Sequence, residues 1–133
     1  MQPLVSIDEI RAAAATLAGV TVHTPLVPFP RTDPPLLIKP ESLQPVGAFK
    51  LRGAYAAMST LPAAARRSGV VTHSSGNHGQ AVAYAAALLG MPAVVVVPDN
   101  APAVKVAAIR ELGADIVVSA PMSLPRSYAR RAL

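Results

Sequence analysis

The chain has 133 residues, of which 52% are hydrophobic and 4% aromatic, and it contains no cysteine. This length allows one small domain or part of a larger one, the apolar content excludes intrinsic disorder, and the lack of cysteine excludes disulfide bonds and thiolate metal sites. The net charge is +5, but Arg126, Arg130 and Arg131 follow Ser119, so the residues up to Ser119 carry only +2, with nine basic and seven acidic side chains. Because few aromatic side chains are available for base stacking, we expect no nucleic-acid partner.

The N-terminal part of the sequence predicts one helix followed by a proline-rich segment. Ser6 and Glu9 have the spacing of a capping box, and apolar residues follow at helical spacing up to Gly19. Residues 20–35 contain five prolines, which excludes a long regular element. The short apolar run at residues 36–39 suits a strand.

Strands and helices alternate in the rest of the chain. We expect strands at residues 70–72, 93–97 and 116–118, and helices at residues 53–61, 78–89 and 102–112. Apolar strands separated by helices indicate parallel βαβ units and a sheet that is covered on both faces. The predicted fold class is therefore α/β, an open parallel sheet with flanking helices.

The longest apolar stretch does not predict a membrane span. It covers residues 81–97, and Gly90 and Pro92 divide it into a helix and a strand. Asp8 and Glu9 precede the first arginine, so the positively charged start of a secretory signal is missing. We expect a cytoplasmic protein without a membrane segment.

The loop after the strand at residues 70–72 is the first candidate ligand site. It reads Ser74-Ser75-Gly76-Asn77-His78-Gly79. In open α/β sheets, ligands bind beyond the carboxyl ends of the strands, where loop N–H groups and helix N-termini favour anions. The alternative is a solvated loop in which Asn77 caps the following helix.

Other common ligand signatures are missing from the sequence. Neither GxGxxG after a strand nor GxxxxGK[ST] occurs, so neither a dinucleotide nor a nucleoside triphosphate is the expected ligand. His23, His73 and His78 have no carboxylate or cysteine partners at ligand spacing, so we expect no metal site.

Lys50 is the second candidate for chemistry. The chain has three lysines, and Lys50 lies between Gly47 and Gly53 in an otherwise apolar stretch. Desolvation and the neighbouring Arg52 would both lower the pKa of this amine and make it nucleophilic. The alternative is a surface lysine at the start of a helix.

Several segments, taken together, resemble one family. Residues 44–52 resemble the lysine motif of the pyridoxal-phosphate enzymes of the tryptophan synthase β-like class (fold type II), specifically the serine/threonine dehydratase and serine racemase branch. Further matching segments are residues 23–26, 39–45, 74–80, 96–98, 101–102 with Lys105, and 110–115. The resemblance is collinear from about residue 7 to residue 118.

The resemblance implies a tryptophan synthase β-like fold and pyridoxal 5'-phosphate as the cofactor. Lys50 would form the imine with this cofactor, and Phe49 would pack beside its ring. Asn77 would donate a hydrogen bond to its phenolic oxygen. The loop that would bind the carboxylate of a small amino-acid substrate consists of Ser74, Ser75, Gly76, Asn77 and His78.

Three functions remain open at this point. The first is β-elimination of L-serine or L-threonine to a 2-oxo acid and ammonia, in which Lys50 would remove the α-proton. The second is an amino-acid racemase of the serine racemase type. In this family the position of Ser75 is often Ala in dehydratases and Ser in racemases, so Ser75 would be a second catalytic residue, although its hydroxyl would equally suit carboxylate binding or helix capping. The third is a truncated, non-catalytic fragment of such an enzyme.

The resemblance also suggests how the chain is organised. Residues 1–52 would be the N-terminal part of the large pyridoxal-phosphate domain, left incomplete, residues 53–118 a small α/β domain, and residues 119–133 a divergent tail. The family's glycine-rich cup for the cofactor phosphate, its partner for the pyridine nitrogen and its divalent-cation site have no counterpart in this sequence. We therefore expect a truncated or frameshifted product with little turnover alone, and a homo-oligomer when completed.

Overall fold

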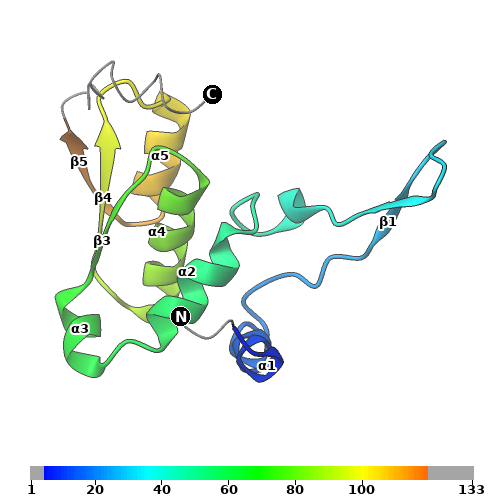
Figure 1. The fold of residues 1–133 in the computed structure, drawn as a ribbon. Helices are drawn as coiled ribbons and strands as arrows, with labels where there is room; N and C mark the ends of the chain where they lie inside the picture. Colours follow the sequence, from blue (N-terminus) through cyan, green and yellow to red (C-terminus); the bar gives the residue numbers. More distant parts are fainter. Residues whose placement is uncertain (1–4, 120–133) are drawn as a thin grey trace, which may run out of the picture.

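The computed structural model describes residues 5–119 (Figure 1). A three-stranded parallel sheet has helices packed against it, and an antiparallel hairpin projects away from this body. The elements in chain order are α1 (Ile7–Thr16), β1 (Val27–Phe29), β2 (Leu36–Ile38), the short 3-10 helix η1 (Glu41–Leu43), α2 (Lys50–Ser59), α3 (Ala63–Ser68), β3 (Val70–His73), α4 (Asn77–Leu89), β4 (Ala93–Pro98), α5 (Ala103–Glu111) and β5 (Asp115–Ser119).

The sheet has the order β3-β4-β5, and both strand pairs are parallel. Val70 lies opposite Ala93, and Val94 lies opposite Asp115. Because α4 and α5 return the chain between successive strands, all three strands end at the same edge of the sheet. The predicted α/β class with a parallel sheet is confirmed.

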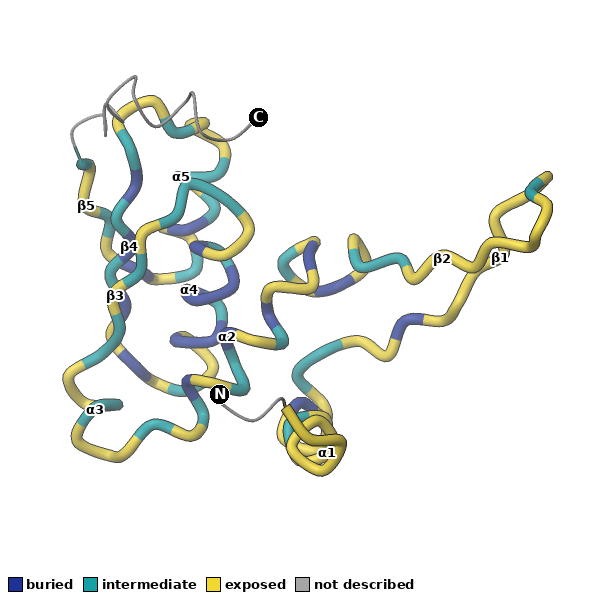
Figure 2. The backbone as a smooth tube through the Cα atoms, in the orientation of Figure 1, coloured by how far each residue is buried: buried dark blue, intermediate teal, exposed yellow. Residues whose placement is uncertain are grey.

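The core lies between the sheet and helices α2, α4 and α5. Leu51, Val95 and Ile109 are fully buried, and they come from α2, β4 and α5. α4 is buried along most of its length and is rich in alanine, so α2 on one side and the sheet on the other pack closely against it. Figure 2 shows this concentration of buried residues on α2, α4 and β4.

The expectation of a sheet covered on both faces is wrong for the residues that the structure describes. The central strand β4 alternates buried and half-buried residues, as a strand does when only one of its faces is packed. Val71 on β3 is 73% exposed, and Val118 on β5 is 60% exposed. Apolar composition predicted the strands correctly, but it could not show which face the helices would cover.

The N-terminal region contains two elements that the sequence predicted, α1 and β2, and others that it did not. The capping box of α1 is formed by Ser6 and Glu9, as predicted. The strand predicted at residues 36–39 is confirmed as β2, whereas its partner β1 was missed because Pro28 lies in it, opposite Leu37. A two-stranded hairpin tolerates this proline, because each strand has an edge that makes no ladder bonds. The short helix α3 was also not predicted.

Helix α2 begins at Lys50, three residues before the predicted start. It therefore runs without a break across residue 53, where the sequence suggested a domain boundary, and that division stays a prediction. Ser119 ends β5, and the remainder of the expected tail lies outside the described residues. Between residues 5 and 119, no helix is long and apolar enough to cross a membrane.

Candidate functional site

A buried side-chain amide fixes the chain that leads to Lys50. Gln44 is 3% exposed, and its Oε1 accepts a hydrogen bond of 3.0 Å from the Val22 N–H, while its Nε2 donates one of 2.9 Å to the Val22 carbonyl oxygen. The Gly47 N–H then donates to the Gln44 carbonyl oxygen at 2.7 Å, and the φ of +66° at Gly47 favours glycine. This turn directs the chain into α2.

A bidentate ion pair holds the first turn of α2. Arg52 Nη1 donates to Glu41 Oε2 at 2.8 Å, and Arg52 Nη2 donates to Glu41 Oε1. Both side chains are half-buried, and the paired geometry is the one in which arginine binds a carboxylate most strongly. The charge of Arg52 is therefore compensated by Glu41, so it is not free to act on Lys50 as the sequence suggested.

Lys50 itself is the first residue of α2, and its side chain is exposed. Its Nζ lies 5.1 Å from the centroid of the Phe49 ring, which is within range of a cation–π contact. The next residue, Leu51, is fully buried and anchors the start of the helix in the core. Within residues 5–119, the Lys50 ammonium makes no hydrogen bond or ion pair, so it is accessible to a ligand.

The serine-rich loop lies at the carboxyl end of β3. The Ser74 N–H donates to the Val96 carbonyl oxygen at 2.9 Å, which extends the pairing between β3 and β4 by one residue. The Gly76 N–H donates to Ser74 Oγ at 3.2 Å and closes a tight turn. Ser75 is half-buried, and its hydroxyl makes no hydrogen bond in the described part of the chain.

This loop leads into a helix N-terminus that has no side-chain cap. Gly76 is the N-cap of α4, so the alternative in which Asn77 caps the helix is wrong. The Gln80 N–H makes the first helical hydrogen bond, to the Gly76 carbonyl oxygen, so the N–H groups of Asn77, His78 and Gly79 precede the helical ladder. Free N–H groups and the helix dipole make this end of α4 suitable for an anion such as a carboxylate.

Two residues of this region were not assigned a role from the sequence. A Cβ at Gly79 would lie 2.9 Å from the Ser74 carbonyl oxygen and 3.1 Å from Val95 Cγ1, so only glycine allows α4 to approach the loop and the sheet this closely. Lys105 on α5 donates from Nζ to Asn77 Oδ1 at 3.4 Å. The presence of Lys105 in a segment that matches the family was the only signal for it, whereas nothing in the sequence indicated the close packing at Gly79.

The two groups of candidate residues lie on helices that pack together. α2 contacts α4, and in Figure 1 the two helices lie side by side and both run downward from their first residues. Phe49 and Lys50 form one group, and the loop from Ser74 to His78 forms the other. Among residues 5–119, no side-chain hydrogen bond or ion pair joins the two groups directly. A hollow of about 780 Å³ between α1 and α2 is lined by none of the candidate residues.

Comparison with known proteins gives the family of the chain. Residues 12–132 match the family model described as pyridoxal-phosphate dependent enzyme. The chain belongs to this family. The family resemblance inferred from the sequence is confirmed.

Individual relatives and structures agree with the family. The chain is 47% identical over 118 residues to an L-threo-3-hydroxyaspartate ammonia-lyase of Pseudomonas sp, with 86% of this chain and 37% of the relative covered. An L-threonine ammonia-lyase of Thermotoga maritima is 39% identical over 119 residues, with 86% and 30% covered. The structure of maize serine racemase matches with a TM-score of 0.84 and 42% identity over 94% of this chain and 39% of that chain. The chain thus spans between 30% and 39% of the length of these proteins.

Proposed function

We propose that this chain supplies the reactive lysine and the substrate-carboxylate loop of a pyridoxal-phosphate dependent ammonia-lyase that acts on 3-hydroxy amino acids. The observation that carries the proposal is the N-terminus of α4, which has no side-chain cap and follows a loop with two serines. α4 packs against α2, the helix that begins with Lys50. Ammonia-lyases among the relatives support the same reaction class.

The residues present fit the cofactor. An exposed primary amine is the group that reacts with an aldehyde, and the Phe49 ring beside it offers an apolar surface to an aromatic ring. The Asn77 side chain carries an NH₂ group that can donate to a phenolic oxygen. When bound, pyridoxal phosphate supplies an electron sink that makes the substrate α-proton acidic.

In this proposal each group of the chain has one task. The Lys50 amine would hold the cofactor covalently, and as a free amine it would accept the proton from the substrate α-carbon. The substrate carboxylate binds the free N–H groups of Asn77 and His78, with Gly76 and the hydroxyls of Ser74 and Ser75 beside them. Holding the carboxylate at the end of α4 orients the α-carbon for this proton transfer. Overall, serine yields pyruvate and ammonia, and threonine yields 2-oxobutanoate and ammonia.

A serine racemase activity is the second candidate. It is favoured by the half-buried Ser75, whose hydroxyl is free of partners in residues 5–119 and is therefore able to donate a proton. The structural similarity to maize serine racemase supports this candidate as well.

Reductive trapping tests the assignment of Lys50. Borohydride treatment of the chain with pyridoxal phosphate, followed by peptide mass spectrometry, compares labelling at its three lysines. We expect labelling at Lys50 and its loss in Lys50→Ala. Preferential labelling of Lys39 or Lys105 would contradict the proposal.

Turnover is best measured in a chimera that joins residues 5–119 to the C-terminal part of the Pseudomonas relative. Release of ammonia and a 2-oxo acid from L-serine, L-threonine and L-threo-3-hydroxyaspartate would be compared. We expect turnover, and we expect Lys50→Ala to lower kcat by about a thousandfold or more. An active chimera in which Lys50→Ala keeps full kcat would exclude the proposed role.

A further inference from the structure

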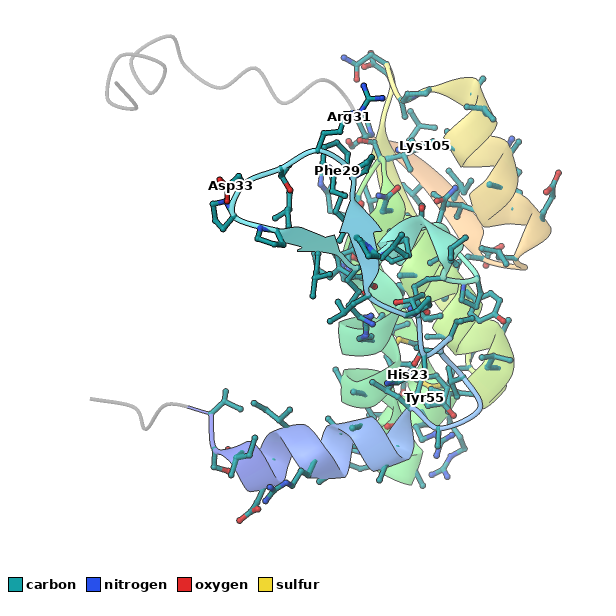
Figure 3. All side chains as sticks on the ribbon, turned by 90° about the vertical axis from the view of Figure 1, so that its right-hand side faces the viewer. His23, Phe29, Arg31, Asp33, Tyr55 and Lys105 are labelled. Atoms are coloured by element: carbon teal, nitrogen blue, oxygen red, sulfur yellow. The ribbon has the colours of Figure 1, made fainter. Side chains whose placement is uncertain are left out.

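Lys105 reaches from α5 to the first residue of α4. Its Nζ donates to Asn77 Oδ1 at 3.4 Å and would lie 3.9 Å from a Cβ built on Gly76. Figure 3 shows Lys105 near the start of α5, on the same body as the sheet and away from the tip of the hairpin at Asp33. In the described part of the chain, no carboxylate pairs with the Lys105 ammonium.

The position of this lysine is unusual for a surface cation. The helix dipole places partial positive charge at the N-terminus of α4, so an ammonium here is disfavoured unless it serves another contact. The contact that it makes is to a side-chain amide oxygen. The hydrogen bond to Asn77, and not an ion pair, therefore accounts for the position of the Lys105 ammonium.

We propose that Lys105 is a positioning residue that fixes the orientation of the Asn77 side-chain amide. An ammonium group can only donate hydrogen bonds, whereas an amide has an acceptor oxygen at one end and a donor NH₂ group at the other. With Oδ1 bound to Lys105, the NH₂ group of Asn77 is left free to donate to an anionic oxygen of a ligand. The inference rests on the proposed function of Asn77 toward the cofactor.

Without Lys105, both orientations of the amide become accessible. In one of them Asn77 would present its oxygen to the anionic oxygen of the ligand, which repels it. The two orientations of the Asn77 amide have nearly the same shape. The Lys105 ammonium thus selects the one in which the NH₂ group faces the ligand. Arginine at position 105 would keep this selection, because the guanidinium group also only donates.

The first arm of the test needs no cofactor. The side-chain NH₂ signals of Asn77 are followed by ¹⁵N NMR in the full chain and in the variants Lys105→Met, Lys105→Arg and Arg110→Met. Arg110 is an exposed cation on the same helix, so its variant controls for the loss of charge on α5. We expect the Asn77 signals to shift in Lys105→Met and to remain in place in the other two variants. Circular dichroism confirms that each variant is folded.

The second arm measures cofactor binding. Absorbance titration with pyridoxal phosphate gives the apparent Kd and the position of the band of the bound cofactor. We expect Lys105→Met to bind about fivefold more weakly, with a displaced band, because an oriented hydrogen bond to an anionic oxygen is lost. Lys105→Arg should bind within about twofold of the unmodified chain.

The possible outcomes separate this inference from the proposed function. Unchanged Asn77 signals and unchanged Kd in Lys105→Met would overturn the role of Lys105, as would equal effects of Lys105→Met and Arg110→Met. If Lys50 is not trapped but the Asn77 signals shift only in Lys105→Met, the proposed function fails while the orienting contact stands.

Discussion

Glu41 and Arg52 join η1 to the first turn of α2, with two hydrogen bonds between one carboxylate and one guanidinium group. Arg52 is two residues from Lys50 on the same helix, so this pair sets the position from which the lysine extends. The Glu41–Arg52 pair therefore both stabilises the N-terminal region and fixes the position of Lys50 in the candidate site.

Breaking this pair should destabilise the chain. We expect Glu41→Ala to lower the free energy of unfolding by about 1–2 kcal/mol, because it leaves a half-buried guanidinium group unpaired. Urea denaturation measures the change. The matched control is Asp8→Ala, which removes the exposed Asp8–Arg11 pair and should cost less than about 0.5 kcal/mol. Equal costs for the two variants would show that the Glu41 pair behaves as an ordinary surface contact.

Gly79→Ala should disturb the serine-rich loop. The added Cβ would meet the Ser74 carbonyl oxygen at 2.9 Å, and because backbone cannot move aside cheaply, we expect a loss of about 1–3 kcal/mol in unfolding free energy. Gly53→Ala in α2 is the control, since a Cβ there meets nothing within 4 Å and alanine favours helix by about 0.5–1 kcal/mol. If Gly79→Ala were as stable as Gly53→Ala, the serine-rich loop would accommodate the added Cβ, and the close packing at Gly79 would not be required.

Ser75→Ala distinguishes the two candidate activities in the chimera. Both begin with proton removal by Lys50, but racemisation also needs an acid on the opposite face of the substrate. We expect racemisation of L-serine to fall by about a hundredfold, and elimination by less than about threefold. Equal losses of the two activities would assign Ser75 to carboxylate binding alone and leave the ammonia-lyase as the sole enzymatic candidate.

The capping box of α1 should make stability depend on pH. The Ser6 N–H and hydroxyl donate to the Glu9 carboxylate and lower its pKa below the ordinary value of 4.5. A lowered pKa in the folded chain means that the contribution of Glu9 to stability is fully present above pH 4.5 and is lost as the pH falls through the lowered pKa.

Thermal unfolding between pH 7 and pH 3 tests this dependence. We expect Glu9→Gln to be less stable than the unmodified chain at neutral pH, with the two curves converging under acid conditions. Glu111→Gln is the control, because that exposed carboxylate has no ion pair within residues 5–119. A constant difference across the pH range would mean that the charge of Glu9 is not involved.

The sequence predicted the sheet better than the N-terminal region, for physical reasons. Apolar strands between amphipathic helices have few alternatives to parallel βαβ units, so the ends of β3, β4 and β5 were located to within one residue. In the hairpin, the short apolar run predicted β2, but β1 was not predicted, because Pro28 is unusual in a strand. At the candidate site, residue types identified Lys50 and the serine-rich loop, while the contact of Lys105 with Asn77 depends on how two helices pack, which no local pattern records.

Hydrogen bonds at the base of the hairpin join the segment before β1 to the segment after β2. Gln44 binds Val22 through both ends of its amide, and Lys39 donates to the carbonyl oxygen and hydroxyl of Thr24 at 3.0 and 2.7 Å. Arg31 is exposed near the far tip, where a trypsin-like protease would find it (Figure 3). A cut there would give two fragments that the hydrogen bonds at the base of the hairpin still hold together. Cleavage of the backbone would therefore not by itself release α1 from the rest of the fold.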